Sequence, residues 1–249
     1  MSFSTQINTP RRTYACEKRV SVARWLHVPL PPTLVFSDTH FVPSATSWSD
    51  DAPDDLLALI ETLGGHRLLS LGDLTESVGL RASERAQLFT CERLAALWSV
   101  MRARDLHVLI GNHDVSGEQL IRAYFGEGAV LDREVERQRF CPGLIRLRHG
   151  HEKEHAMTEL MRHIGPLAVP IYERISQSLR PTAERLSNAR VLKTLREDAE
   201  FVLFGHTHSR GIDIEDPRRA WANPGCFLGS AQSFITLEGS GMALYVKRS

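Results

Sequence analysis

Two short segments of the chain carry potential metal ligands two residues apart, each directly after an apolar run. Residues 36–40 read FSDTH, and residues 204–208 read FGHTH. In an extended chain, residues i and i+2 lie on the same face. Carboxylate and imidazole groups that point the same way are typical ligands for a metal ion. Each segment therefore presents one candidate pair: Asp38 with His40, and His206 with His208.

Three further apolar runs end in the same way. The run over residues 67–71 is followed by GD, the run over 106–110 by GNHD, and the run over 144–148 by HGH. In open α/β sheets, ligands gather outside the carboxyl ends of the strands, so residues far apart in the sequence can converge there. The polar side chains at these five ends are Asp38, His40, Asp73, Asn112, His113, Asp114, His149, His206 and His208.

The elements that must position these side chains follow from the hydrophobic pattern. From Thr33 on, short apolar runs alternate with amphipathic stretches, which predicts buried strands alternating with helices. We expect helices over residues 50–64 and 83–105. After Gly211, four strand-like segments with short turns predict antiparallel pairing. The pattern as a whole predicts an α/β sandwich in which one sheet packs on another.

The domain organisation is predicted from where this pattern begins and where it is interrupted. Residues 1–32 lack strong periodicity, and we interpret them as an N-terminal extension with one short strand near residues 19–23. Residues 33–249 are predicted to form a single domain. Within it, residues 152–199 combine helical spacing with prolines, which predicts a helical insertion between two strands.

The composition indicates which kinds of partner and which cellular compartment to expect. The chain has 249 residues with 30 Lys+Arg and 30 Asp+Glu, so its charge favours neither nucleic acid as a stable partner nor a membrane surface. No apolar run has the length of a transmembrane helix or the pattern of a secretory signal. The four cysteines show no CxxC spacing, so we expect free thiols and a cytoplasmic protein.

The five motifs, in this order, resemble those of the calcineurin-like metallophosphoesterase family. They read D-x-H, G-D, G-N-H-D, H and G-H-x-H, and the resemblance covers the chain from about Thr33 to its end. It implies a four-layer α-β-β-α sandwich of two mixed sheets flanked by helices. The insertion over residues 152–199 would then be a helical cap.

The resemblance also implies a centre of two divalent metal ions bridged by Asp73. Two cations held ~3.5–4 Å apart can neutralise phosphate oxygens and activate a water molecule near neutral pH. Imidazole, carboxylate and amide ligands without thiolate favour Mn²⁺, with Fe or Zn²⁺ as alternatives. The implied ligands complete two sites: Asp38, His40 and His208 at one, and Asn112, His149 and His206 at the other.

Further roles are assigned to residues beside these ligands. The resemblance makes His113 the general acid or transition-state stabiliser, with Asp114 orienting its ring. We interpret Glu76 as a carboxylate in the first turn of a helix, favoured by the helix dipole. Between the two histidines of HGH, the family pattern favours His149 as the ligand, and His151 would cap a helix or contact substrate.

These features predict a hydrolase of phosphoester or phosphoanhydride bonds, with a phosphodiesterase preferred. Its substrate would be a small phosphorylated molecule such as a nucleotide or phosphodiester. Protein phosphatases of the family carry GDxxDRG, whereas LTESVG follows Asp73 here, and GNHD is more typical of phosphodiesterases and nucleotide pyrophosphatases. The sequence identifies no substrate-binding residue and no oligomeric state.

Three other functions remain as alternatives. The insertion resembles the cap of UDP-2,3-diacylglucosamine diphosphatases, which favours a nucleotide-sugar or lipid diphosphatase, although those enzymes commonly have HGD where this chain has HGH. A catalytically silent protein-binding scaffold is possible on the same fold, but such proteins are expected to lose ligands, and this chain retains them. Residues 151–155 read HEKEH, the zinc-protease pattern, but they are polar throughout and directly follow a strand.

Overall fold

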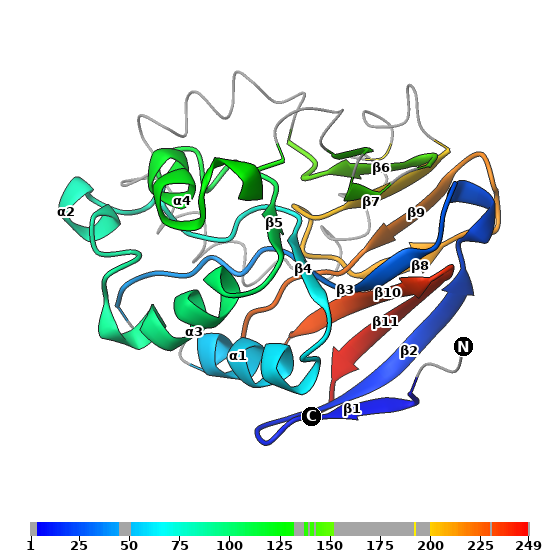
Figure 1. Ribbon diagram of the computed structural model, residues 1–249, viewed down its shortest axis with the longest axis horizontal. Helices are drawn as coiled ribbons and strands as arrows, with labels where there is room; N and C mark the ends of the chain where they lie inside the picture. Colours follow the sequence, from blue (N-terminus) through cyan, green and yellow to red (C-terminus); the bar gives the residue numbers. More distant parts are fainter. Residues whose placement is uncertain are drawn as a thin grey trace, which may run out of the picture.

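The described part of the chain forms two mixed β-sheets that pack face to face (Figure 1). The predicted helical insertion over residues 152–199 lies outside it, apart from Leu192. None of the described helices is long and apolar enough to cross a membrane. The computed structural model describes residues 4–44, 51–131, 137–138, 140–141, 143–151, 192, 200–229 and 231–248.

The larger sheet has the strand order β1-β2-β11-β10-β3-β4-β5 among the described residues. Strands β3, β4 and β5 pair in parallel, and the remaining pairs are antiparallel. Its strands are β1 (Gln6–Asn8), β2 (Thr13–Ser21), β3 (Leu30–Phe36), β4 (Arg67–Ser70), β5 (Leu106–Val108), β10 (Ser233–Gly239) and β11 (Gly241–Lys247).

The smaller sheet has the order β6-β7-β9-β8. Strands β6, β7 and β9 are parallel, whereas β8 pairs antiparallel with β9. Antiparallel pairing of the C-terminal segments is therefore confirmed for β10 with β11 and for β8 with β9. The strands are β6 (Ile145–Arg148), β7 (Phe201–Phe204), β8 (Gly211–Asp213) and β9 (Ala220–Asn223).

Helices α1 (Ala52–Thr62) and α3 (Glu92–Arg102) cover the face of the larger sheet that points away from the smaller one (Figure 1). The predicted single helix over residues 83–105 is wrong, because the chain forms α2 (Ala82–Arg85) and α3 with a break between them. At the break, the indole Nε1–H of Trp98 donates to the Leu88 carbonyl at 2.7 Å. A continuous helix would use that carbonyl for its own backbone ladder. Helix α4 (Glu118–Phe125) follows β5.

Strand side chains alternate between separate apolar layers. On β3, Leu34 and Phe36 pack toward the helices, whereas Val35 packs into the layer between the two sheets. On β7, the side chains of residues 201 and 203 face the layer between the sheets, and those of residues 202 and 204 face the outer side with Leu192. Both faces are buried, which explains why these runs are continuously apolar and why their register is fixed. The α/β sandwich of two mixed sheets is confirmed.

The segment before Thr33 contributes more structure than the sequence predicted. We expected one short strand near residues 19–23, but β1 and β2 extend the larger sheet beyond β11. Two arginines in the turn between β1 and β2 bind a carboxylate of α1. Arg11 Nε and Arg12 Nε donate to the two carboxylate oxygens of Asp55 at 3.0 and 2.9 Å, and the Asp55 side chain is fully buried. The domain boundary at residue 33 remains a prediction.

We predict that Asp55→Asn destabilises the protein by about 1.5–3 kcal/mol, the usual range for hydrogen bonds to a charged group. Burial raises the pKa of Asp55, but hydrogen bonds from Gln232, Arg11 and Arg12 outweigh it and lower the pKa. The resulting stabilisation is present above pH ~4, where the unfolded carboxyl is ionised, and is lost as the pH falls through the folded-state pKa.

Urea unfolding of the wild type and Asp55→Asn at several pH values measures both effects. The matched control is Asp54→Asn, since Asp54 lies on the same helix with its side chain 58% exposed and only a 3.6 Å contact with Arg11. Equal stability loss in the two variants at neutral pH would contradict the assignment.

Candidate metal centre

The carboxyl ends of strands from both sheets meet at one place. Loops after β3, β4 and β5 come from the larger sheet, and loops after β6 and β7 come from the smaller one. Three sets of imidazole and carboxylate groups lie there with their ligand atoms within 4.8 Å of one another, and one set, His40, Asp73 and His113, comes from the larger sheet alone. The other two sets are ligand groups that draw on both sheets. Their members are Asp38, His40 and His208 in the first group, and Asp73, His149 and His206 in the second.

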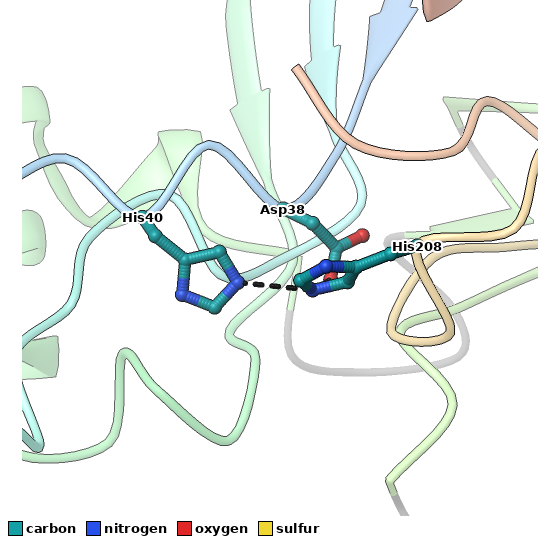
Figure 2. Close-up of side chains that lie close together, drawn as sticks. All are labelled: Asp38, His40 and His208. Atoms are coloured by element: carbon teal, nitrogen blue, oxygen red, sulfur yellow. Dashed lines mark hydrogen bonds and ion pairs between the residues drawn. The ribbon is translucent and has the colours of Figure 1, made fainter. Parts of the chain in front are cut away.

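In the first group, three ligand atoms converge (Figure 2). The Nε2 atoms of His40 and His208 are 3.2 Å apart, and His208 Nε2 is 3.3 Å from Asp38 Oδ1. Asp38 Oδ1 is buried and accepts no hydrogen bond within the described residues. A buried carboxylate oxygen without a hydrogen bond is costly, and a cation between these atoms would remove that cost.

In the second group, acceptor atoms face one another. His149 Nδ1–H donates to the Leu71 carbonyl at 2.7 Å, so in the neutral ring Nε2 carries a lone pair. That Nε2 lies 3.1 Å from Asn112 Oδ1 and 3.2 Å from Asp73 Oδ2, and both of these oxygens are acceptors as well. Three acceptors at such distances repel unless a proton or a cation lies between them.

Asp73 lies between the two groups. Its Oδ2 is 3.2 Å from His149 Nε2 and 3.8 Å from His40 Nε2, which belong to different groups. Its Oδ1 accepts the backbone N–H of His113 at 2.8 Å. Burial raises the pKa of Asp73, but the charges of His149 and His113 outweigh it and hold that pKa well below its usual range. An ionised carboxylate in this position can bridge two cations.

Glu76 is the residue of this centre that the sequence interpretation missed. Its carboxylate accepts from His40 Nδ1 at 2.8 Å and from His113 Nδ1 at 2.8 Å, and Glu76 is only 5% exposed. The interpretation of Glu76 as a first-turn helix carboxylate is wrong, because it lies in the loop that follows β4, before α2. The signal that could have found it is its place in the loop that carries Asp73.

The contacts of Glu76 also determine the charge states of Glu76 and His113. Burial raises the pKa of Glu76, but the charge and hydrogen bonds of the histidines lower it to about 2. Burial lowers the pKa of His113, but the negative charges of Glu76 and Asp73 raise it to about 10. The contact also fixes the tautomer of His40, since Nδ1–H points to Glu76 and Nε2 points toward His208 and Asp73.

Asp114 does not orient the His113 ring, so that prediction is wrong. Its carboxylate accepts the backbone N–H groups of Gly111, Leu74 and Thr75 at 3.1, 3.1 and 2.8 Å, and the Thr75 hydroxyl at 2.9 Å. Burial and the charge of Asp73 raise the pKa of Asp114 to about 6. Asp114 therefore ties the loop after β4 to the loop after β5, which fixes the separation of Asp73 and Asn112.

His151, the other histidine of HGH, lies at the edge of the centre. Its ring centroid is 5.1 Å from that of His149 and 6.4 Å from that of His206, and it belongs to neither ligand group. The structure thus brings His149 into the centre, as the sequence favoured, and leaves His151 beside it.

The backbone of the predicted ligands is strained. Within the described residues, non-glycine side chains with positive φ occur at five positions, and all five are predicted ligands. Such a conformation costs of order 1–3 kcal/mol per residue and persists where the surroundings impose it, most often at functional sites. The φ angles are 54° at Asp38, 44° at His40, 52° at Asp73, 68° at His206 and 56° at His208.

Glycines allow the loops to approach one another. Gly72 allows a sharp turn of the backbone, since its φ is 103°. At positions 111 and 205 a glycine is required for lack of space. A Cβ on Gly111 would collide with the Asp73 carboxylate, and a Cβ on Gly205 would collide with the Ser37 hydroxyl. Each motif is therefore packed against a ligand or a neighbour from another motif.

A model of the calcineurin-like phosphoesterase superfamily domain matches residues 33–240. The chain belongs to the calcineurin-like phosphoesterase superfamily. It is accordingly a metal-dependent phosphoester hydrolase. The match covers all five motifs from which the resemblance was inferred, and it begins where the strand and helix alternation begins.

Several solved structures are similar to this chain at low sequence identity. A dimetal phosphatase from Danio rerio is 11% identical with a TM-score of 0.48, covering 89% of this chain and 100% of that one. A metallophosphoesterase from Sphaerobacter thermophilus is 14% identical with a TM-score of 0.39, covering 88% of each chain. Vps29 from Entamoeba histolytica, complexed with zinc, is 17% identical with a TM-score of 0.37, covering 86% and 91%. No curated protein matches the sequence.

We predict that Gly205→Ala removes metal binding at the first ligand group, because its Cβ would displace Ser37 and the Asp38 carboxylate. The control is Gly65→Ala, where a Cβ meets no atom within 4 Å. Metal content after dialysis against Mn²⁺, measured by mass spectrometry, separates the two variants. Full metal content in Gly205→Ala would show that metal binding does not require the close contact of Gly205 with Ser37 and Asp38.

Proposed function

We propose that the chain hydrolyses phosphodiester bonds of small phosphorylated substrates with two divalent ions, preferably Mn²⁺. The observation that carries the proposal is the convergence of two acceptor groups around the shared carboxylate of Asp73. One cation would be held by Asp38, His40, His208 and Asp73, and the other by Asp73, Asn112, His149 and His206. When bound, the pair supplies neutralisation of phosphoryl oxygens and activation of a water molecule.

The donor types fit the proposed metal. Both groups consist of imidazole and carboxylate, and Asn112 adds an amide oxygen beside His149. This mixture of nitrogen and oxygen ligands suits Mn²⁺, and it is compatible with Fe and Zn²⁺. The neutral tautomers of His40 and His149 are already set by Glu76 and the Leu71 carbonyl, so both rings offer Nε2 to a metal.

His113 is the proposed proton donor to the leaving group. Its Nδ1 is held by Glu76, which leaves Nε2 as the ring nitrogen that can hold a proton for transfer. Its ring lies 4.6 Å from the His40 ring, between centroids, and its side chain is 20% exposed, so a substrate can reach it. Glu76 is then a positioning residue that orients both a ligand and the acid.

The preference for a diester rests on the loop after Asp73. That loop reads LTESVG and lacks the arginine of the protein-phosphatase pattern, and the following motif is GNHD. An arginine that binds the phosphate stabilises a phosphomonoester dianion more than a diester monoanion, because the dianion carries one more negative charge. The loop therefore favours a substrate of lower charge.

We predict that the Mn²⁺-loaded protein hydrolyses bis-p-nitrophenyl phosphate and that Asp73→Asn removes most of this activity. The amide of Asn cannot supply the charge that two adjacent cations need. Release of p-nitrophenol with Mn²⁺, Zn²⁺ and Fe²⁺ measures both points. If protein that binds two equivalents of metal shows no turnover with any of them, the enzymatic proposal fails and a scaffold role is favoured.

We predict that His113→Ala keeps two equivalents of metal but lowers kcat by about 10²–10⁴-fold, the usual contribution of a general acid. Glu76→Gln should lower kcat by about 10–100-fold, as is typical for a residue that orients a ligand. Because Glu76 would act through His113, the cost of Glu76→Gln should be smaller in the His113→Ala background. Glu61→Gln, an exposed position on α1, is the control.

Equal metal loss in His113→Ala and Asp73→Asn would show that His113 is a ligand and not the acid. Full additivity of the two kcat effects in the double variant would show that Glu76 acts on the metal ligand His40 alone.

A further inference from the structure

A cavity of about 390 Å³ lies apart from the metal centre, and none of its lining residues belongs to that centre. Cavities of roughly 300–1,000 Å³ are the usual size for small-molecule sites. It opens beside the start of β4, whereas Asp73 follows the end of that strand. The lining residues are Arg67, His107, Glu127, Gly128, Val130, Leu131 and Phe140.

Arg67 brings a guanidinium group without a counter-ion into this cavity. Its central carbon lies 4.0 Å from the centroid of the Phe140 ring. Its N–H groups make only long hydrogen bonds, at 3.3 and 3.4 Å to the Thr33 hydroxyl and 3.5 Å to the Phe140 carbonyl. In the described part of the chain, no carboxylate lies within ion-pair distance of it. Arginine has five N–H donors, and the two N–H groups of Nη1 have no hydrogen-bond partner among the described residues.

Partial burial makes this charge costly. Burial lowers the pKa of Arg67, and the charge of Asp105 opposes that shift only in part. A charge that has lost hydration is stabilised by a counter-ion, and a planar guanidinium pairs most strongly with an oxyanion. The contact with the Phe140 ring holds the guanidinium at the cavity, so the group is already positioned for such a partner.

His107 adds a second polar group at the same ring. Its Nε2–H donates to Asp105 Oδ1 at 3.0 Å, and its ring centroid lies 4.6 Å from that of Phe140. Its Nδ1 is buried and has no hydrogen-bond partner in the described part of the chain. That nitrogen is closed to solvent, so a ligand in the cavity cannot contact it, and His107 contributes its ring as a wall of the cavity.

Among the described residues that line the cavity, one is acidic, Glu127. Its Oε2 pairs with Arg122 Nη1 at 2.8 Å, and its side chain is 78% exposed. The charge of Glu127 is therefore balanced by Arg122 and hydrated by solvent, so Glu127 competes only weakly with a ligand for Arg67. The remaining walls are apolar, at Val130 and Leu131, and apolar walls strengthen an ion pair by excluding water.

We propose that this cavity binds a small oxyanion, the phosphate or carboxylate group of a low-molecular-weight ligand, through the guanidinium of Arg67, with the His107 ring as one wall of the site. The site is separate from the metal centre, and it does not depend on the proposed function. Its specificity comes from one guanidinium whose central carbon lies over the Phe140 ring, between the walls formed by His107, Val130 and Leu131.

The test is an NMR titration. The full chain is loaded with diamagnetic Zn²⁺, inorganic phosphate is added stepwise, and the histidine ring signals are followed. His107→Gln identifies the His107 signal among the 11 histidines. We expect that signal to shift saturably with phosphate, and to need at least about tenfold more phosphate in Arg67→Met, since a charge-assisted pair is lost. A parallel titration with acetate distinguishes a carboxylate site from a phosphate site.

Two control variants separate this cavity from the metal centre. Arg67→Met should bind the same amount of Zn²⁺ as the wild type, which shows that it is folded. Asp73→Asn should retain the response of His107 to phosphate. The proposal is overturned if the His107 signal does not respond to either anion, if it responds equally in Arg67→Met, or if its response disappears in Asp73→Asn.

Discussion

The structure of the centre depends on one electrostatic constraint, the meeting of several acceptor atoms with too few protons between them. His149 Nε2 lies within hydrogen-bond distance of both Asp73 Oδ2 and Asn112 Oδ1, and Asp38 Oδ1 is buried without a hydrogen bond from the described residues. Such an arrangement is unfavourable in a buried site unless positive charge compensates it. Two divalent cations shared by Asp73 would provide that charge, which is the chemistry of the superfamily to which the chain belongs.

The packing of the two sheets determines whether these atoms meet. Each ligand group takes residues from loops on both sheets, so the layer between the sheets sets the distance across the centre. Val35 and Leu69 of the larger sheet and Leu203 of the smaller one belong to that layer. A shift of one sheet against the other would move His206 and His208 together relative to Asp38 and Asp73. The apolar core thus positions the ligands although none of its members touches a substrate.

The loops that carry the ligands are held by contacts from one loop to another. Asp114 joins the loop after β5 to the backbone of the loop after β4, and Glu76 joins the His40 ring to the His113 ring. Asn223, at the end of β9, donates to the Gly205 carbonyl at 3.2 Å and to the Thr207 hydroxyl at 2.9 Å, which steadies the GHTH loop. These contacts hold the positive φ angles of the predicted ligands, a conformation that an isolated loop would not keep.

The sequence by itself determined the order of the motifs, the strands β3, β4, β5, β6 and β7 that precede them, and the α/β class, because hydrophobic period and residue type are local properties. Only the tertiary structure decided the roles of Glu76 and Asp114, since each bonds to a segment more than 30 residues away, apart from the Asp114 contact with Gly111. Likewise, β2 pairs with β11, at the far end of the chain, and β1 pairs with β2. The helix break near Leu88 forms with a hydrogen bond from the Trp98 indole. Contacts of this kind depend on how loops and sheets pack in space, which local pattern does not encode.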